Sequence, residues 1–390
     1  MVTSLFPSPP RPNEGVFAER RWRGMAARGH LVEVWHPQPR APWPWLPGLP
    51  DAWREAARRP AREVRGDLLV RRPRYLHLPG RARGNARRFA ASVLPRLGPV
   101  DVVVCDYAWP AGALAPLLRS GRSGRAACVI SGRGSDVLEV AGEAGLGDEL
   151  TRCLEAAGHW CAVSRDLVER MDSLGGRPGH GVLVPNGVDT ELFRPRPRAS
   201  ARRELGLEPQ GPLVLVVGHL IPRKDPLLAL RVFAAGAPTD ARLVFVGRGP
   251  LESELCAAIE HAGLCDRARL VGEVPPEVLA IWLAAADLVL LTSRREGRPH
   301  VVLEALASGR PVLATAAGGT GELLGEGPML ATTRDAAALG RSLAALLASP
   351  PSAEALRARV AGLSWGASFE ALEGCLRRAV AERGERSATA

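Results

Sequence analysis

Short apolar runs alternate along this chain with stretches in which apolar residues recur every three or four positions. The runs predict buried strands, and the periodic stretches predict helices that cover them. The runs lie at 2–6, 30–35, 100–106, 126–131 and 181–188, and then at 212–218, 241–247, 268–272, 287–293 and 311–315. Apolar strands that alternate with helices are typical of parallel sheets covered on both faces. The pattern therefore predicts an α/β fold with doubly wound, Rossmann-like sheets.

A proline- and arginine-rich stretch at 186–211 interrupts the pattern, as expected of a hinge. We therefore expect one Rossmann-like domain at 1–190, a second at 191–365, and a final helix at 366–390 that returns to the first domain. Open α/β sheets bind ligands beyond the carboxyl ends of their strands. The functional site is accordingly expected in a cleft between the two domains.

Lys224 is the single lysine among the 51 strong bases of the sequence. Because arginine is favoured everywhere else, the retained lysine indicates a position that requires a compact ammonium group. It follows the run 212–218, and Asp225 and Pro226 then open a helical pattern. A cation at this point would meet phosphate above exposed helix N–H groups. The alternative interpretation is a solvated lysine without a special role.

The net charge of +10 is concentrated early in the chain, since residues 20–96 contain 18 arginines and 5 acidic residues. This excess predicts an anionic partner, such as membrane headgroups, a lipid pyrophosphate or an acidic polymer. The alternative is an arginine excess of genomic origin on a solvated face. Nucleic acid is not indicated, because no binding motif is present and Trp43 and Trp45 lie in a proline-rich loop at 36–50. That loop could form a lip for an acceptor or a bilayer, or pack over its own domain.

The seven cysteines form no C-x-x-C pair, so neither a zinc site nor a disulfide framework is indicated. No apolar run reaches the length of a membrane span, and no signal peptide is recognisable. These features predict a cytoplasmic protein, with peripheral contact to the inner membrane through the arginine-rich first domain.

The densest chemical signal lies at 292–315, where a buried strand ends in a polar loop and a helix follows. Glu296 lies in the loop, and Glu304 lies one to two turns into the helix. Two carboxylates at different depths can hold different hydroxyls of one sugar-containing ligand. Taken alone, each residue could equally be an ordinary loop or helix acid near a helix N-terminus.

Together these segments resemble a retaining, nucleotide-sugar-dependent glycosyltransferase of the GT-B fold, glycosyltransferase family 4. The resemblance covers nearly the whole chain. It is carried by RPNEGVFAERRWRGMAARGHLVEVW, SGRGSD, VPNGVDTELF, VGHLIPRKDP, VGRGPL and LTSRREGRPHVVLEALASGRPVLAT. The resemblance implies that the first domain binds the acceptor and the second binds the nucleotide sugar.

The catalytic roles follow from the resemblance. Lys224 would bind the donor diphosphate with help from Arg223, and Glu296 would contact hydroxyls of the transferred sugar. His219 stands where many members have arginine, which leaves the second phosphate contact open. Arg133 stands where many relatives have histidine, so a proton-handling role is lost there and charge stabilisation is expected instead.

The remaining site residues are also implied by resemblance. Glu304 would bind the ribose hydroxyls, and Val274 would lie near the base. On the acceptor side, Gly15 would make room for the reacting groups and Asp136 would orient its loop. The other donor-binding residues are Gly218, Gly297, Arg298, Pro299, His300 and Val301.

The expected activity is transfer of a sugar from a nucleotide diphosphate to a saccharide or lipid-linked acceptor with retention of configuration. Envelope or extracellular polysaccharide synthesis is the expected setting. No cofactor is expected, and no metal, because the sequence contains no Asp-x-Asp. Three rival interpretations are an inactive partner subunit of a polysaccharide-assembly complex, a nucleotide-sugar epimerase, and a glycoside hydrolase with Glu296 and Glu304 as its acids.

Overall fold

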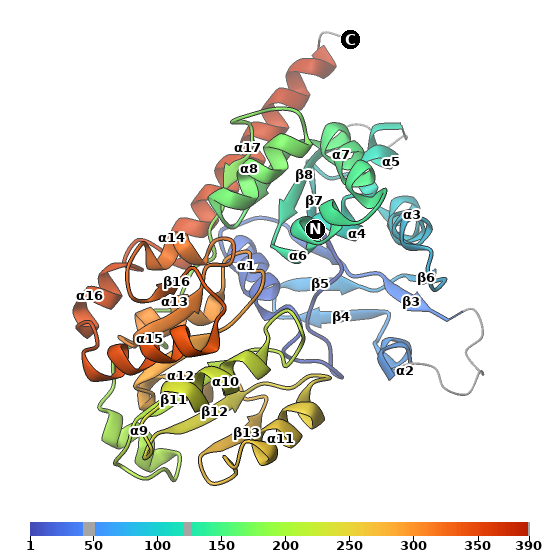
Figure 1. Ribbon diagram of the computed structural model, residues 1–390. Helices are drawn as coiled ribbons and strands as arrows, with labels where there is room; N and C mark the ends of the chain where they lie inside the picture. Colours follow the sequence, from blue (N-terminus) through green and yellow to red (C-terminus); the bar gives the residue numbers. More distant parts are fainter. Residues whose placement is uncertain (42–50, 121–125, 389–390) are drawn as a thin grey trace. The chain divides into compact units, whose positions relative to one another are not determined.

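The structure is a computed structural model that describes residues 1–41, 51–120 and 126–388 (Figure 1). The chain divides into two compact units. Unit 1 comprises Met1–Pro185 and Ser368–Ala390, and unit 2 comprises Asn186–Ala367. The tryptophans of the predicted lip, Trp43 and Trp45, lie outside the described residues.

Unit 1 is built on an eight-stranded sheet with the order β10-β9-β8-β7-β1-β2-β5-β4. The strand pairs are parallel except that β4 runs antiparallel to β5. Its strands are β1 Val2–Thr3, β2 Glu33–Trp35, β4 Arg62–Arg65, β5 Leu68–Arg71, β7 Val102–Asp106, β8 Ala127–Gly132, β9 Gly158–Ala162 and β10 Val182–Leu183. A separate parallel pair joins β3 Gln38–Arg40 to β6 Arg74–Leu76.

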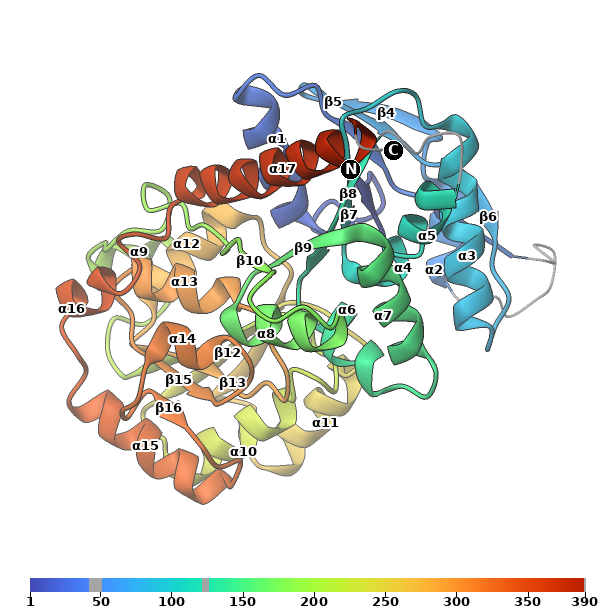
Figure 2. The same cartoon turned by 90° about the horizontal axis from the view of Figure 1, so that it is seen from above.

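Helices cover both faces of this sheet (Figure 2). Successive residues of β7 point to opposite faces, and Val103 and Val104 accordingly belong to different apolar clusters. One cluster includes α17 residues such as Leu372, and the other includes α3 residues such as Phe89. The helices are α1 Val16–Ala27, α2 Asp51–Arg58, α3 Ala82–Val93, α4 Ala108–Ala111, α5 Leu114–Ser120, α6 Ser135–Leu138, α7 Leu146–Ala157, α8 Arg165–Leu174 and α17 Trp365–Ala388, with 3-10 turns η1 Leu94–Arg96 and η2 Val140–Gly142.

Unit 2 contains a six-stranded sheet with the order β13-β12-β11-β14-β15-β16, in which every pair is parallel. Its strands are β11 Leu213–Val217, β12 Arg242–Val246, β13 Ala268–Gly272, β14 Leu288–Leu291, β15 Val312–Thr315 and β16 Leu330–Ala331. The order reverses at β11, which lies between β12 and β14. Ligands of open parallel sheets bind beyond the carboxyl ends of the strands at such a reversal.

The helices of unit 2 pack against this sheet around one continuous apolar cluster. They are α9 Arg198–Glu204, α10 Pro226–Gly236, α11 Glu252–His261, α12 Pro276–Ala285, α13 His300–Ala307, α14 Thr320–Leu324, α15 Ala336–Ala348 and α16 Ala353–Ala358. The α/β architecture predicted from the apolar pattern is confirmed in both units. Within the described part of the chain, no helix combines the length and apolarity needed to cross a bilayer.

The ends of several strands differ from the prediction. The run at 2–6 was expected to be one strand, but β1 covers only Val2–Thr3, where it pairs with its neighbours on both sides. The proline-rich stretch after residue 35 was expected to be a loop, yet Gln38–Arg40 forms β3. The length of a strand depends on how far its neighbouring strand pairs with it, and an apolar run in the sequence does not show which strand that neighbour is.

Candidate functional site

The backbone segments that follow β11 and β12 approach each other closely at two glycines. Gly218, which follows β11, donates its N–H to the carbonyl of Val246 at 2.9 Å. A Cβ at Gly247, where φ is 136°, would lie 2.1 Å from the carbonyl oxygen of Gly218. Only glycine tolerates both this φ and this approach. The two glycines therefore bring the strand ends together beside the first turn of α10.

Lys224 lies at the point where this loop enters α10. Asp225 caps the helix, because its carboxylate accepts the N–H of Leu228 at 3.2 Å. A Cβ at Gly218 would lie 3.7 Å from Cε of Lys224, so the lysine stem passes along this glycine. Its Nζ donates to Oε1 of Glu296 at 2.5 Å. The lysine predicted to be functional is thus paired with the first of the two predicted carboxylates.

Glu296 lies in the loop between β14 and α13, with a side chain that is 6% exposed. Its Oε1 also accepts the hydroxyl of Ser293 at 2.5 Å. Nη1 of Arg223 lies 3.9 Å from Oε2 of Glu296 and donates to the carbonyl of Arg295 at 3.2 Å. Lys224 and Arg223 therefore join the loop after β11 to the loop after β14 at the carboxyl edge of the sheet.

A second set of contacts fixes the backbone under this pair, and sequence analysis did not identify it. The carboxylate of Asp225 lies 2.7 Å from Nη2 of Arg334 and 2.8 Å from Nη2 of Arg294. Arg334 also donates through Nη1 to the carbonyl of Ser293 at 2.9 Å. The hydroxyl of Thr292 donates to the carbonyls of Lys224 and Asp225 at 3.2 and 2.9 Å. We call Asp225, Thr292 and Arg334 the brace.

The segment from Gly297 to Val301 is largely buried, and His300 is its one partly exposed residue. Arg298 directs its guanidinium to Glu322 at 3.1 Å, with 6% of the side chain exposed. Pro299 precedes α13, and Val301 is 7% exposed within the apolar cluster. The donor contacts expected at these positions stay a prediction.

The second predicted carboxylate lies on α13. Within this fully described helix, His300 and Glu304 are partly exposed and the other six residues are buried. Residues four positions apart share one face of a helix. His300 also stacks on Trp365, with ring centroids 6.1 Å apart and an interplanar angle of 20°. The accessible face of α13 therefore presents an imidazole and a carboxylate.

Two further predicted donor residues lie beyond the ends of β11 and β13. The side chain of His219 is 65% exposed, and its Nε2 is 3.9 Å from Oε1 of Glu273. Val274 is partly buried and packs against the apolar cluster of unit 2. Both positions are accessible at the carboxyl edge, as a role in binding a nucleotide would require.

In unit 1, Arg133 follows β8 at the carboxyl edge of the sheet. Its Nε donates to Oδ1 of Asp106 at 2.7 Å, and its side chain is 5% exposed. The indole N–H of Trp22 donates to Oδ2 of the same carboxylate at 3.0 Å. Burial raises the pKa of Asp106, but the charges of Arg133 and Arg21 together with the hydrogen bonds outweigh it and lower the pKa below its ordinary value. Asp106 therefore holds the guanidinium of Arg133 as an ion pair.

Asp136 fixes the loop that carries Arg133. Its carboxylate accepts the backbone N–H groups of Ala108, Arg133 and Gly134 at 2.5, 2.9 and 2.7 Å. Burial is the largest influence on this group and raises the pKa of Asp136 to about 6. The three hydrogen bonds place the loops after β7 and β8 in a fixed relationship.

Gly15 precedes α1 with φ at 72°, and a Cβ there would lie 2.8 Å from the backbone of Leu5. Any side chain would collide with this backbone. Phe17 lies in the first turn of α1, and its ring is 5.7 Å from the guanidinium carbon of Arg133. The structure thus places Gly15, Arg133 and Asp136 at one edge of unit 1.

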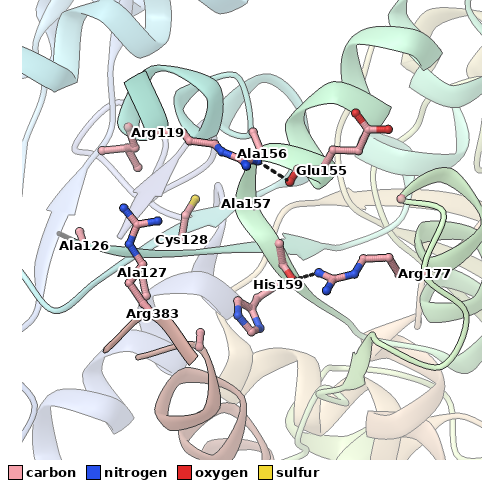
Figure 3. Close-up of a pocket in the computed structure, with 14 residues that line it drawn as sticks. Arg119, Ala126, Ala127, Cys128, Glu155, Ala156, Ala157, His159, Arg177 and Arg383 are labelled. Atoms are coloured by element: carbon pink, nitrogen blue, oxygen red, sulfur yellow. Dashed lines mark hydrogen bonds between the residues drawn. The ribbon is translucent and has the colours of Figure 1, made fainter. Parts of the chain in front are cut away.

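A pocket of about 400 Å³ opens at the opposite, amino edge of this sheet, where β8 and β9 begin (Figure 3). Arg119, Arg177 and Arg383 line it. Arg119 donates to the carbonyl of Glu155 at 3.5 Å, and Arg177 donates to that of Gly158 at 3.0 Å. Arg119 and Arg177 thus satisfy carbonyls at the end of α7, where the helix dipole is negative. The pocket therefore suits structural capping better than an anionic ligand.

No group of three or more His, Cys, Asp or Glu side chains is arranged to hold a metal ion among the described residues. The charged side chains at the carboxyl edge of unit 2 include Lys224, Arg223 and Glu296.

Comparisons with known proteins identify the family of the chain. Residues 15–192 match the model of Glycosyltransferase Family 4, and residues 197–361 match that of Glycosyl transferases group 1. The chain is 30% identical over 335 residues to the putative teichuronic acid biosynthesis glycosyltransferase TuaC of Bacillus subtilis, covering 83% of this chain and 82% of that protein. It is also 35% identical to the D-inositol 3-phosphate glycosyltransferase of Acidothermus cellulolyticus, although this match spans about half of each protein, 56% and 52%.

Solved structures with little sequence identity share the fold. The sucrose-phosphate synthase of Thermosynechococcus elongatus superposes with a TM-score of 0.77 at 22% identity, covering 94% of this chain and 93% of that one. Anabaena HepE in complex with UDP and glucose gives 0.73 at 19% identity, covering 97% and 99%. The family models, the TuaC relationship and the two doubly wound units together show that the chain belongs to the glycosyltransferases of the GT-B fold.

Proposed function

We propose that this glycosyltransferase moves a sugar from a nucleotide diphosphate to a saccharide or lipid-linked acceptor, with retention of configuration and without a metal ion. We assign the donor to unit 2, within the 191–365 domain expected from the sequence, and the acceptor to unit 1, within 1–190. The helix at 366–390 completes unit 1 in this assignment. The contact between Lys224 and Glu296 is the observation that carries the proposal.

The chemistry of the leaving group explains the cation. Cleavage of the bond between the sugar C1 and the phosphate oxygen leaves negative charge on the diphosphate. Lys224, with Arg223 nearby, supplies positive charge where the loop meets the start of α10, and the helix dipole has the same sign there. A positioned charge of this kind contributes about 3 kcal/mol to transition-state stabilisation. Such side-chain charge takes the part that a metal ion plays in other enzymes.

The sugar and the acceptor account for the remaining groups. Glu296 would hold hydroxyls of the transferred sugar, and Glu304 on α13 would hold those of the ribose. The acceptor hydroxyl would form its bond to C1 on the face from which the diphosphate leaves, and its proton would pass to a departing phosphate oxygen. This sequence retains the anomeric configuration.

The names of related proteins support a role in envelope polysaccharide assembly. TuaC is described as acting in teichuronic acid biosynthesis, and the neighbouring structures include HepE with UDP and glucose. We extend to this chain a nucleotide sugar as donor and a cytoplasmic location with peripheral contact to the inner membrane. The arginine excess at 20–96 favours such contact with an anionic surface.

A donor panel tests the proposal. UDP-, GDP- and ADP-sugars are added separately to the protein, and thermal unfolding is recorded, because a ligand that binds only the native state raises its stability. We expect one nucleotide family to raise the melting temperature in the wild type. Turnover with that donor, followed by nucleotide release and by the anomeric configuration of the product, then reports the activity.

The outcomes separate the alternatives. Release of nucleotide only when an acceptor extract is present supports a transferase, and conversion of the donor sugar without acceptor would indicate an epimerase. Binding without any turnover in the wild type would indicate an inactive partner subunit. If no nucleotide sugar shifts the melting temperature, the assignment of the donor to unit 2 is wrong.

A further inference from the structure

A groove of about 610 Å³ lies in unit 1 between the first turn of α3 and the segment that joins η2 to α7. Helices α3 and α7 are neighbours in both views (Figures 1 and 2). Each leads into a strand of the parallel sheet, α3 into β7 and α7 into β9, so each begins at the carboxyl edge of that sheet. This is the edge at which Arg133 and Asp136 lie. The groove therefore occupies the side of the sheet where ligands bind in this class of fold.

The charges around the groove oppose the usual pattern of a helix N-terminus. The first turn of α3 contains no acidic residue, and no side chain caps it. Instead, Arg81 is the N-cap residue and Arg83 is the second residue of the helix. Helix N-termini carry partial positive charge and normally attract acids, so two arginines here are unfavourable in the absence of an anion. Departures from local preference of this kind are expected at functional sites.

The arginines differ in how far the protein itself neutralises them. Arg83 donates through Nε and Nη2 to the carbonyl of Gly145, at 3.0 and 2.6 Å, and lies 4.0 Å from Glu149. Arg81 and Arg88 form no ion pair with any described residue. Arg88 makes only a long hydrogen bond, 3.4 Å, to Oδ1 of Asn85. Among the described residues, no acidic side chain therefore neutralises the guanidinium groups of Arg81 and Arg88.

The backbone also leaves room and donors for an anion. Gly84 lies in the first turn of α3, and a Cβ there would be 3.2 Å from Nη1 of Arg88, so the guanidinium folds back over the glycine toward the helix start. The first N–H groups of an α-helix have no partner within the helix. In the described structure the first backbone hydrogen bond of α3 is donated by Asn85, to the carbonyl of Arg81. The amides of residues 82–84 are thus left to solvent or a ligand.

The groove has one acidic residue in its lining, Glu143, and it is exposed. Guanidinium groups match the oxygen geometry of phosphate, and backbone N–H groups at a helix start add further donors. We propose that this groove binds a phosphoryl group of the acceptor, held by Arg81, Arg88 and the first turn of α3. The assignment of that group to the acceptor rests on the proposed function, whereas the anion site itself rests on the groove alone.

Inorganic phosphate is the probe for the site. It is titrated by calorimetry into the full-length chain carrying Lys224→Ala, so that the donor diphosphate site does not contribute. We expect Arg81→Gln and Arg88→Gln each to raise the Kd by about tenfold, the effect of losing one charge-assisted hydrogen bond. Glu143→Gln removes the opposing charge and is expected to lower the Kd by about threefold. Thermal melting confirms that each variant is folded.

Arg62→Gln is the matched control, because Arg62 is exposed on β4, has the same charge and does not line the groove. An unchanged Kd in this variant supports a specific site. Equal losses in Arg62→Gln and Arg81→Gln would show only a diffuse basic surface, and the groove proposal would be wrong. The same conclusion follows if Glu143→Gln weakens phosphate binding.

A second arm distinguishes the source of the phosphoryl group. Glycerol 3-phosphate represents a soluble acceptor, and phosphatidylcholine vesicles with phosphatidylglycerol represent a lipid. Loss of binding in Arg81→Gln but not Arg62→Gln supports the groove with either probe and identifies the source. Vesicle binding that all arginine variants weaken equally, with no phosphate binding, would overturn it. Donor binding is measured in the same variants with Lys224 restored. If the donor binds, but the groove variants bind phosphate and vesicles as well as Arg62→Gln does, only the groove proposal is wrong. If no donor binds to the wild type, the proposed function is wrong.

Discussion

Nζ of Lys224 lies 2.5 Å from Oε1 of Glu296, and the two side chains are 20% and 6% exposed. An ion pair withdrawn this far from water is stronger than one on an open surface. The cation that we assign to the donor diphosphate is therefore neutralised, in the absence of donor, by the carboxylate that we assign to the sugar. Binding of a diphosphate requires that Lys224 be shared with Glu296 or released from it.

This competition predicts an unusual response to Glu296→Gln. The variant frees Lys224 and removes a negative charge near the diphosphate, so affinity for a free nucleoside diphosphate should rise by about five- to tenfold. Turnover of the complete nucleotide sugar should fall by about a hundredfold, because the sugar loses a charged hydrogen-bond partner. Calorimetric titration and steady-state assays measure the two effects. A variant that binds nucleoside diphosphate more weakly than the wild type would contradict the competition.

Lys224 should not be replaceable by arginine. We expect Lys224→Ala to lower kcat/KM by about 10²- to 10³-fold, the range for loss of one positioned charge. The stem of Lys224 passes along Gly218, and its compact head contacts a nearly buried carboxylate. A planar guanidinium needs more space, so Lys224→Arg should recover no more than about a tenth of the lost activity.

The control for this substitution is Arg62→Lys on β4 of unit 1, which reverses the exchange at an exposed position. It should leave kcat/KM unchanged. Full activity of Lys224→Arg would show that charge alone matters and that the retention of one lysine in the chain carries no functional information.

Glu304 should act on the nucleoside and not on the phosphates. It shares the accessible face of α13 with His300, one helical turn away. Glu304→Gln should weaken binding of the nucleoside diphosphate by about 10- to 100-fold, the cost of one or two hydrogen bonds to a charged group. Binding of pyrophosphate should remain unchanged. Glu354→Gln, at an exposed acid of α16, provides the matched control. Equal effects on both ligands would contradict the assignment to ribose.

Arg334 should affect turnover more than donor binding. It joins Asp225 before α10 to the carbonyl of Ser293 after β14, and so holds the two loops that carry Lys224 and Glu296. Arg334→Gln should lower kcat by about tenfold with little change in KM, because displacement of reacting groups by about an ångström is costly. The single ammonium group of Arg334→Lys can bind the carboxylate of Asp225 or the carbonyl of Ser293, but not both. This variant should restore part of kcat.

Arg341→Gln on α15 has the same charge change at an exposed position and should have no effect. A purely structural role would lower the melting temperature of Arg334→Gln without moving kcat at temperatures where the variant is folded. That result would show that Arg334 stabilises the fold and does not position the reacting groups.

Local patterns in the sequence were sufficient for much of this picture. Alternating apolar runs and helical periodicity predicted the α/β architecture, because burial on both faces of a parallel sheet leaves a visible pattern. The proximity of Lys224 and Glu296 could also be predicted from the sequence, since both follow strands whose carboxyl ends must meet at one edge of a sheet. The expectation did not require knowledge of side-chain contacts.

Other contacts could not be predicted from the sequence. Arg334 is more than a hundred positions from Asp225, in a loop after β16 with no recognisable motif. Among so many arginines, nothing in composition distinguishes it. Asp106 ends a strand that the sequence predicted, but its pairing with Arg133 could be identified only from the fold. Long-range polar pairs depend on strand order, and strand order is not written in local periodicity.

The charge of Asp106 should contribute to the stability of unit 1 in a way that depends on pH. It is fully buried, and its lowered pKa means that its contribution to stability is present above pH about 4 and is lost as pH falls through the folded-state value. Asp106→Asn leaves Arg133 and Arg21 without this counter-charge and should cost about 3–5 kcal/mol at neutral pH. Since the wild type loses the same charge in acid, the difference between the two proteins should shrink as the pH falls below about 4. Asp106→Asn combined with Arg133→Met should recover part of the loss. Calorimetric unfolding across this pH range measures each effect, and a difference independent of pH would show that packing around Asp106, and not its charge, stabilises the edge of the sheet.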